Sequence, residues 1–316
     1  MSGAKASRAR SRTSAAPSAR ARAGHAGSGG GLWPWLFIGP TLVGIGALYV
    51  WPLIQNVAYS FAKWGPFGGA EFTGLANYRR LLSDTSLLDA LANTLVYTGI
   101  VLLGIPIAIV IAALLARPGL RGAWLYRMLF LMPYIAMPTA VALVWRLIFN
   151  GDFGVLNQVL AHAGIHGPHW VSTPGYALLA VSVVGLWSSL GLSVIILGAG
   201  LRSIPTELYE AAQLDGAGSW RILRSITVPL LTPSIFFVSV ITVINAFQLF
   251  DLLFALLGQE NPAMPATQSL VLKFYNVGIV AGDRGYAAAI AVLILVLIGA
   301  LTALQFSAQR RWVHYG

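Results

Sequence analysis

The sequence predicts an all-α, polytopic membrane protein with six transmembrane helices and with both termini in the cytoplasm. Three observations support this fold class. Hydrophobic residues make up 57% of the chain and charged residues only 9%, whereas about a quarter of an ordinary soluble domain is charged. Six apolar runs are each long enough to cross about 30 Å of hydrocarbon. Lysine and arginine are concentrated on alternate connections between these runs.

The six apolar runs follow one another along most of the chain. We expect the spans at Leu32–Ile54, Leu91–Leu115, Tyr126–Phe149, Tyr176–Leu201, Thr232–Leu257 and Tyr286–Phe306. Pro106 interrupts the second run, and Pro133 and Pro138 lie inside the third. A proline is tolerated within a span when neighbouring helices satisfy the freed carbonyl groups. Spans two and three are therefore expected to be kinked and buried in a bundle.

The ends of the chain differ in composition from this transmembrane domain (32–309). Residues 1–31 are rich in Arg, Ala, Ser and Gly and contain no acid. Such a segment cannot bury a core, so we expect a disordered basic tail in the cytoplasm. A mitochondrial transit peptide is the alternative, but no amphipathic apolar face accompanies the arginines. Residues 310–316 are expected to form a second short cytoplasmic end.

The orientation follows from the basic residues, because cytoplasmic loops carry an excess of Lys and Arg. Six of them lie in the tail. The second-to-third connection, the fourth-to-fifth connection and the C-terminal end add Arg117, Arg121, Arg127, Arg202, Arg221, Arg224, Arg310 and Arg311. The opposite side has Lys63, Arg79, Arg80, Lys273 and Arg284, and Arg146 lies near its membrane boundary. This asymmetry of fourteen to five predicts that the first side is cytoplasmic.

The connection 202–229 carries an unusual number of charges for this chain, and they are Arg202, Glu207, Glu210, Asp215, Arg221 and Arg224. Pro205 suits the first position of a helix, and Gly216 suits the end of that helix. Ser219 can cap a second short helix, which Pro229 is expected to end. We expect a helix–turn–helix against the membrane face. It is either a solvated connector or a docking surface for a soluble partner, and its length and regular punctuation favour docking.

The connection also contains a recognisable motif. Residues 210–212 read EAA, Gly216 follows after three residues, and Ile226-Thr227-Val228-Pro229 follows after nine more. This resembles the EAA loop of ABC importer permeases, EAA-x3-G-x9-I-x-L-P, with Val228 in place of Leu. Three further segments resemble the MalF-like permease subunit of carbohydrate ABC importers. They are SFAKWGPFGGAEFTGLANYRRLL (60–82), NTLVYT (93–98) and LMPYIAMPTAVALVWRLIFNGDFGVLN (131–157).

The resemblance implies a type I ABC importer permease fold in which this loop is a coupling helix that docks into a cytoplasmic ATPase. It implies ATPase-coupling roles for Glu210, Ala211, Ala212, Asp215 and Gly216. The chain contains no G-x-x-x-x-G-K-[ST] motif, so ATP and Mg²⁺ would be bound by the partner ATPase and no cofactor is expected here. The expected partners are a homologous second permease, an ATPase dimer, an extracytoplasmic sugar-binding protein, a carbohydrate and membrane lipid, and not nucleic acid. A bacterial cytoplasmic membrane is the expected location.

Polar residues at bilayer depth are candidate substrate contacts. We select six of them, Trp187, Ser188, Ser189, Thr242, Asn245 and Gln248, and the resemblance places Gly185 and Leu192 beside them. Trp187 and Asn245 are a plausible pair, because sugars stack on aromatic rings and bind amides. The small residues have an alternative explanation, because Ser and Gly within spans are more often helix-packing positions. Asp251 is expected near the outer edge of the fifth span. His162, His166 and His169 have no acidic partner nearby, so no metal site is expected.

Two other classes of protein remain as alternatives. A secondary, ion-coupled transporter would usually show an inverted repeat and intramembrane charge pairs, whereas only Arg146 and Asp251 lie near the spans and no repeat is evident. A membrane-embedded enzyme would need clustered acids, His or a Ser–Lys pair at depth, and none is visible. The sequence therefore favours a transporter subunit over an enzyme.

Overall fold

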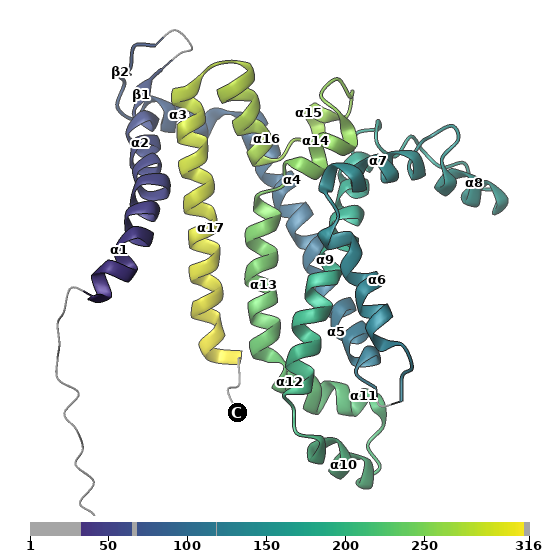
Figure 1. Ribbon diagram of the computed structural model, residues 1–316. Coiled ribbons are helices and arrows are strands. Elements are labelled where there is room, and N and C mark those ends of the chain that lie inside the picture. The colour runs from purple at the N-terminus through teal and green to yellow at the C-terminus, as the bar shows by residue number, and fades with distance from the viewer. Residues whose placement is uncertain (1–32, 65–67, 118, 313–316) are drawn as a thin grey trace, which may run out of the picture. The chain divides into compact units, whose positions relative to one another are not determined.

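The computed structural model describes residues 33–64, 68–117 and 119–312 (Figure 1). The predicted tail 1–31 lies outside the described residues. The chain divides into two units between Val50 and Trp51. In the first unit, α1 (Trp33–Ile45) is followed by the π-helical η1 (Gly46–Val50).

The second unit is almost entirely helical in its described residues, with a single two-stranded antiparallel sheet of β1 and β2. Its elements, in chain order, are α2 (Trp51–Ser60), β1 (Ala62–Lys63), β2 (Glu71–Phe72), α3 (Ala76–Ser83), α4 (Thr85–Leu102), α5 (Gly104–Leu115), α6 (Ala123–Ile135), α7 (Pro138–Ile148), α8 (Val155–His162), α9 (Tyr176–Arg202), α10 (Thr206–Leu214), α11 (Ser219–Ile222), the π-helical η2 (Leu223–Thr227), α12 (Val228–Leu230), α13 (Thr232–Phe247), α14 (Asp251–Leu257), α15 (Met264–Thr267), α16 (Leu270–Tyr275), the π-helical η3 (Asn276–Val280) and α17 (Arg284–Trp312).

Four helical segments in the described residues are long and apolar enough to cross a membrane, and they are Leu36–Ser60, Thr85–Leu115, Tyr176–Arg202 and Arg284–Arg310. Two bent helix pairs, Ala123–Ile135 with Pro138–Ile148 and Ser219–Leu230 with Thr232–Phe247, bring the number to six if each pair is one span. Each of the six predicted runs overlaps one of these segments, although their bounds differ. The structure therefore establishes a helical membrane protein with four to six candidate spans.

The expected kink of span three is present, and the helix of span two is interrupted close to its proline. The second span changes from α4 to α5 at Leu103, three residues before Pro106. The third changes direction by 98° between α6 and α7. Met137, which precedes Pro138, is extended, with ψ of 129°. A residue before proline is driven out of the helical region by the proline ring, so this break follows from the sequence locally.

The fifth predicted span was wrong in its extent. We expected one helix over Thr232–Leu257, but α13 ends at Phe247 and a separate helix, α14, starts at Asp251. The carbonyl of Leu249, in the gap, accepts a hydrogen bond of 2.6 Å from the buried Ser269 hydroxyl. A non-helical backbone at membrane depth requires such a partner for its freed groups. The break is therefore stabilised by a residue that is distant in sequence.

Helix α9 is central to the packing, because it contacts α4, α5, α6 and α13. Small residues let the backbones approach closely. A Cβ added at Gly191 would lie 2.4 Å from the carbonyl oxygen of Phe130 on α6, and one at Gly200 would lie 2.3 Å from Ser234 Oγ on α13. These glycines fix the distances between α9 and its neighbours.

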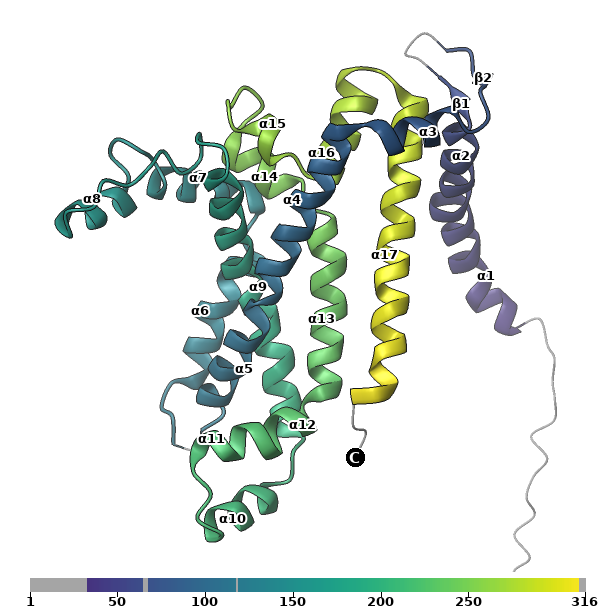
Figure 2. The ribbon, with the colours of Figure 1, turned by 180° about the vertical axis from the view of Figure 1, so that it is seen from behind.

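The connections of the second unit alternate between its two ends, as Figures 1 and 2 both show. The N-terminal end of α6, α10, α11 and the C-terminal end of α17 lie together at one end. The β-hairpin, α8, α15 and α16 lie at the other. The basic residues counted on each predicted side, within this unit, are therefore grouped in the same way by the fold.

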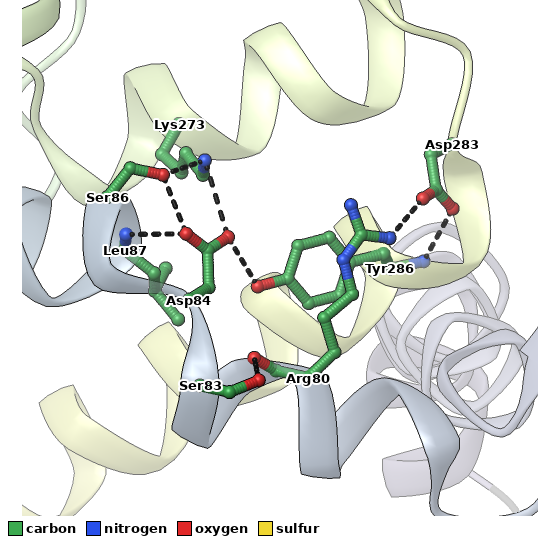
Figure 3. A network of polar contacts seen from close by, with 8 residues as sticks. All are labelled: Arg80, Ser83, Asp84, Ser86, Leu87, Lys273, Asp283 and Tyr286. Atoms are coloured by element: carbon green, nitrogen blue, oxygen red, sulfur yellow. Dashed lines mark hydrogen bonds and ion pairs between the residues drawn. The ribbon is translucent and has the colours of Figure 1, made fainter.

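A polar network joins α3 and α4 to α16 and α17 at the β-hairpin end (Figure 3). Asp84 caps α4 by accepting the Leu87 N–H at 3.2 Å, and it also accepts the Tyr286 hydroxyl at 2.8 Å. Lys273 Nζ lies 3.4 Å from the same carboxylate. Arg80 pairs with Asp283 at 2.6 Å and covers the Tyr286 ring. These contacts join the ends of helices that are about two hundred residues apart in sequence.

Candidate functional site: a cavity among the helices and an exposed helical loop

A cavity of about 430 Å³ lies among α4, α6, α7, α9, α13 and α14. Its lining consists of Tyr97, Val101, Pro133, Tyr134, Ala136, Pro138, Val141, Gly185, Ser188, Ser189, Leu192, Ser193, Ile196, Val238, Ile241, Thr242, Asn245, Ala246, Asp251 and Leu252. Mostly apolar walls with a few polar groups, enclosing several hundred Å³, are typical of a small-molecule site. The α6–α7 break and the α13–α14 break both open onto it, so the two irregular spans form its walls.

Four of the six predicted substrate contacts line this cavity, and they are Ser188, Ser189, Thr242 and Asn245. The Ser189 hydroxyl donates to the carbonyl of Leu186 in its own helix at 2.8 Å. The side chains of Ser188, Thr242 and Asn245 make no hydrogen bond within the described residues. Their donors and acceptors are therefore available to a ligand. Gly185 and Leu192 line the cavity as well.

The other two predicted contacts, Trp187 and Gln248, do not line the cavity. The Trp187 ring is 39% exposed and meets the ring of Trp145 edge-on, with 5.5 Å between centroids. The expected pairing of Trp187 with Asn245 is therefore not found. Residues spaced by three or four along α9 share a face, as Gly185, Ser188, Ser189 and Leu192 do, and Trp187 lies off that face. Gln248 follows the last residue of α13 and is exposed.

Four polar lining residues were not selected from the sequence, and they are Tyr97, Tyr134, Ser193 and Asp251. Tyr97 is only 7% exposed, and its hydroxyl oxygen would be 2.2 Å from a Cβ at Gly185, so the glycine makes room for the ring. A tyrosine in the middle of an apolar run was the available signal. Asp251 was not selected as a contact, but α14 places it in the lining. No local signal predicted that placement, because it depends on the break after Phe247.

The segment NTLVYT positions Tyr97 through two side chains that precede it. Asn93 Nδ2 donates to the carbonyls of Ala266 and Gln268, at 2.9 and 3.1 Å. The buried Thr94 Oγ1 accepts the N–H of Leu270 at 3.1 Å. Together they attach α4 to the segment between α15 and α16. The motif therefore holds α4 in place one turn before the cavity.

The second candidate site is the exposed loop of α10 and α11, where the structure supports the expected stop at Gly216. Gly216 has φ of +71°, which favours glycine. The N–H of Gly216 donates to Gln213 and the N–H of Ala217 donates to Ala212, at 3.0 and 2.9 Å. This pair of bonds is a Schellman motif, which satisfies the last carbonyls of a helix. The loop therefore turns sharply and in a defined way after α10.

Three details of the loop differ from the prediction. Pro205 caps α10 instead of occupying its first position, because the helix begins at Thr206. Gly218, not Ser219, caps α11, and Ser219 is its first residue. The helical run continues through Pro229 to Leu230, because proline is tolerated near the start of α12. The two short helices themselves are present as expected.

One side of α10 is anchored and the other is free. Tyr209 packs against the apolar cluster that includes Leu201 and Leu231. Glu210, Ala211, Asp215 and Gly216 are exposed, and Ala212 is half-buried. Neither Glu210 nor Asp215 forms an ion pair within the described part of the chain. Leu214 is 90% exposed. An apolar side chain and unpaired acids on a rigid, anchored helix are features of a surface made to bind another protein.

A metal centre is not evident in the described residues, where no group of three or more His, Asp and Glu side chains could hold an ion. His162 is hydrogen-bonded through Nδ1 to the Gln158 carbonyl at 2.8 Å.

Comparison with known proteins identifies the family. A family model described as "Binding-protein-dependent transport system inner membrane component" matches residues 104–314. The sn-glycerol-3-phosphate transport system permease protein UgpA of Agrobacterium fabrum strain C58 is 34% identical over 288 residues, which is 90% of this chain and 96% of that protein. UgpA of Rhizobium meliloti strain 1021 is 32% identical over 286 residues, again 90% and 96%.

A solved structure has the same fold. One chain of a bacterial alginate ABC transporter, crystallised in complex with an alginate pentasaccharide-bound periplasmic protein, superposes with a TM-score of 0.78. The match covers 90% of this chain and 96% of that chain at 21% identity. These likenesses are to permease subunits of ABC transporters, not to enzymes, and they do not favour the ion-coupled alternative. The family match spans more than half of the chain, and the chain therefore belongs to the binding-protein-dependent transport system inner membrane components.

Proposed function

We propose that this chain is one of two membrane-spanning subunits of an ABC importer that carries a sugar or oligosaccharide into the cell. In this proposal the bent pairs each cross the membrane once, which makes six crossings, and both termini are cytoplasmic. The cavity is the substrate site of this subunit, with Ser188, Thr242 and Asn245 as contacts. The α10–α11 loop is the coupling element through Glu210, Ala211, Ala212, Asp215 and Gly216.

The observation that carries the proposal is the exposed face of α10. Its acids have no partner in the described residues, while its other face is anchored by Tyr209. A helix fixed on one side can transmit a displacement to the helices that contact it, and α9 leads directly into α10. Because the chain has no phosphate-binding loop of its own, a separate ATPase dimer supplies ATP and Mg²⁺ binding at this face.

The substrate class follows from the chemistry of the cavity. Hydroxyl and amide side chains on mostly apolar walls suit a ligand that presents both hydroxyl groups and apolar C–H faces. The relatives are named for sn-glycerol-3-phosphate, and the solved transporter for alginate, which are both polyhydroxylated. Trp187 and Gln248 lie outside the lining, so they are not part of the proposed contact set. An extracytoplasmic binding protein would deliver the ligand at the β-hairpin end.

Reconstitution tests this proposal. The chain, the second permease and the ATPase are purified together into proteoliposomes, and sugar uptake is measured with and without ATP and the binding protein. We expect uptake and stimulated ATP hydrolysis only with all components, and no effect of ionophores that collapse ion gradients. Uptake by this chain alone, driven by an ion gradient and insensitive to ATP, would instead establish the secondary transporter.

A further inference from the structure

We infer that the cavity selects an uncharged polyhydroxylated ligand and discriminates against anionic ones such as sugar phosphates and uronates, with Asp251 as the residue that sets this preference. The inference rests on the proposed function and specifies the charge of its substrate. It distinguishes this chain from relatives named for a phosphorylated polyol and from a transporter named for an acidic polysaccharide.

The charge of the lining is the first step. Asp251 is the single formally charged side chain among the described lining residues, and Lys, Arg and His are absent from it. The remaining polar groups are hydroxyls of Ser, Thr and Tyr and the amide of Asn245. Recognition of a phosphate or carboxylate relies on charge-assisted bonds from Arg or Lys or on a helix N-terminus. Side chains that could supply such bonds are missing from this wall.

Nearby cations do not compensate for Asp251. It forms no ion pair within the described residues, and the two pairs found there, Arg80–Asp283 and Lys273–Asp84, belong to the network beyond α16. Arg146 lines a separate hollow with Gln259, Glu260 and Asn261. An anion in the cavity would therefore meet an uncompensated negative charge, although Asp251 is itself exposed and water screens part of the repulsion.

The helix ends that face the cavity do not form an anion site either. The short helix α14 begins at Asp251, so a carboxylate already occupies its first turn. Helix α7 begins at Pro138, which has no N–H to donate. The backbone and the side chains of the lining therefore both disfavour an anionic ligand.

The neutral polar groups match a sugar hydroxyl instead. Tyr97 is 7% exposed, and its hydroxyl makes no hydrogen bond within the described residues although the residue lines the cavity. Thr242, at 8% exposed, is likewise without a hydrogen-bond partner there. Neither hydroxyl oxygen is among the buried side-chain atoms that lack a partner, so both are accessible from the cavity. A ligand hydroxyl can donate to and accept from both side chains, and it can donate to the Asp251 carboxylate, which a sugar carboxylate cannot.

Matched pairs of ligands test the inference. The assembled importer, without its binding protein, is placed in nanodiscs, and saturation-transfer NMR titrations compare galactose with galacturonate, glucose with glucuronate, and glycerol with sn-glycerol-3-phosphate. We expect the neutral member of at least the two sugar pairs to bind roughly tenfold or more tightly than its anion, as repulsion by one nearby charge allows. Asp251→Asn should reduce the ratio of the affinity for the neutral ligand to the affinity for its anion. Asp251→Glu keeps the charge and should preserve this ratio.

A control variant and three outcomes make the test decisive. Asp152→Asn removes an equal charge from an exposed position outside the lining, so it should leave the ratio unchanged. Tighter binding of the anions, or an unchanged ratio in an assembled Asp251→Asn complex, overturns the inference while carbohydrate binding stands. If no sugar of either charge binds, the proposed function fails together with it. Co-purification of the ATPase verifies assembly of each variant.

Discussion

Asn245 presents a carboxamide to the cavity from the last turn of α13, and this amide makes no hydrogen bond within the described chain. Asn245→Ala removes a potential bond to a substrate hydroxyl, which is worth about 0.5–1.5 kcal/mol. We therefore expect uptake at low substrate concentration to fall by up to roughly tenfold, with assembly of the complex unchanged. Initial uptake rates in proteoliposomes over a range of concentrations measure the effect.

Gln248→Ala is the matched control for this prediction. It deletes the same functional group three residues later, at an exposed position outside the lining. Its uptake kinetics should resemble those of the wild type. Equal uptake kinetics for both variants would mean that Asn245 is a packing residue. A larger loss of uptake in Gln248→Ala would indicate that the substrate contact lies closer to the break between α13 and α14.

Asp84 makes the stability of the β-hairpin end depend on pH in the acidic range. Burial raises the pKa of this carboxyl, but hydrogen bonds from Ser86 and Tyr286 and the charge of Lys273 lower it more, so the pKa falls from 3.8 to about 2. A carboxyl whose pKa is lower in the folded state than in the unfolded state stabilises the folded state at pH values above the unfolded-state pKa. This stabilisation is lost as the pH falls through the folded-state pKa. The window therefore lies between about pH 4 and pH 2.

We predict that Asp84→Asn lowers the melting temperature at pH 7, by the equivalent of about 1–2 kcal/mol after allowance for solvent screening. The difference from the wild type should shrink towards pH 2, where the wild-type carboxyl is itself becoming neutral. Asp89→Asn, an exposed change on the same helix, is the control. Thermal unfolding followed by tryptophan fluorescence in detergent measures both. A difference that did not depend on pH would contradict the assigned role of the charge.

At the scale of the element, the turn after α10 depends on one backbone angle. Gly216 has φ of +71°, where a side chain costs about 1–2 kcal/mol, and no atom within 4 Å would obstruct an added Cβ. Gly216→Ala therefore strains the backbone without a clash. We predict that it lowers substrate-stimulated ATP hydrolysis more than Glu210→Ala does, because it shifts the whole exposed face of α10 instead of removing one contact.

Gly218→Ala provides the comparison, since Gly218 has φ of −67° and equally open surroundings. It should retain nearly full stimulated hydrolysis. Membrane insertion and yield should be unchanged in all three variants, because none lies in a candidate span. Full assembly and full stimulation in Gly216→Ala would show that the loop is a plain connector, as the sequence alone also allowed.

For the whole molecule, the basic residues and the fold of the second unit lead to a topology that can be tested. The N-terminal end of α6, α10–α11 and the end of α17 lie at the same end (Figure 2), and most of the arginines are there. We predict that a reporter fused at Gly218 is cytoplasmic and that one fused after Gln259 is outside. Paired alkaline phosphatase and fluorescent-protein fusions measure this. A cytoplasmic signal at Gln259 is incompatible with six crossings.

Features that depend on nearby residues could be predicted from the sequence by itself. The apolar runs located every candidate span, because length and hydropathy decide whether a helix can be solvated by lipid. Pro106 and Pro138 predicted kinks, and Gly216 predicted the helix stop, because each acts on its own backbone or its neighbour's. The two short helices of the 202–229 connection were likewise predictable without the fold.

Only the tertiary structure decided which polar residues share the cavity. Asp251 reaches the lining because α13 ends at Phe247, and that break is stabilised by the bond from Ser269 to Leu249, twenty positions apart. Tyr97 enters because Gly185 leaves space for its ring. Trp187 is excluded by the rotation of α9 about its axis, which its contacts with several helices determine. Hydropathy measures the free energy of transferring a helix into lipid. For an apolar helix this free energy is nearly the same at every rotation about the helix axis. The direction in which each side chain points is therefore determined only by packing against other helices.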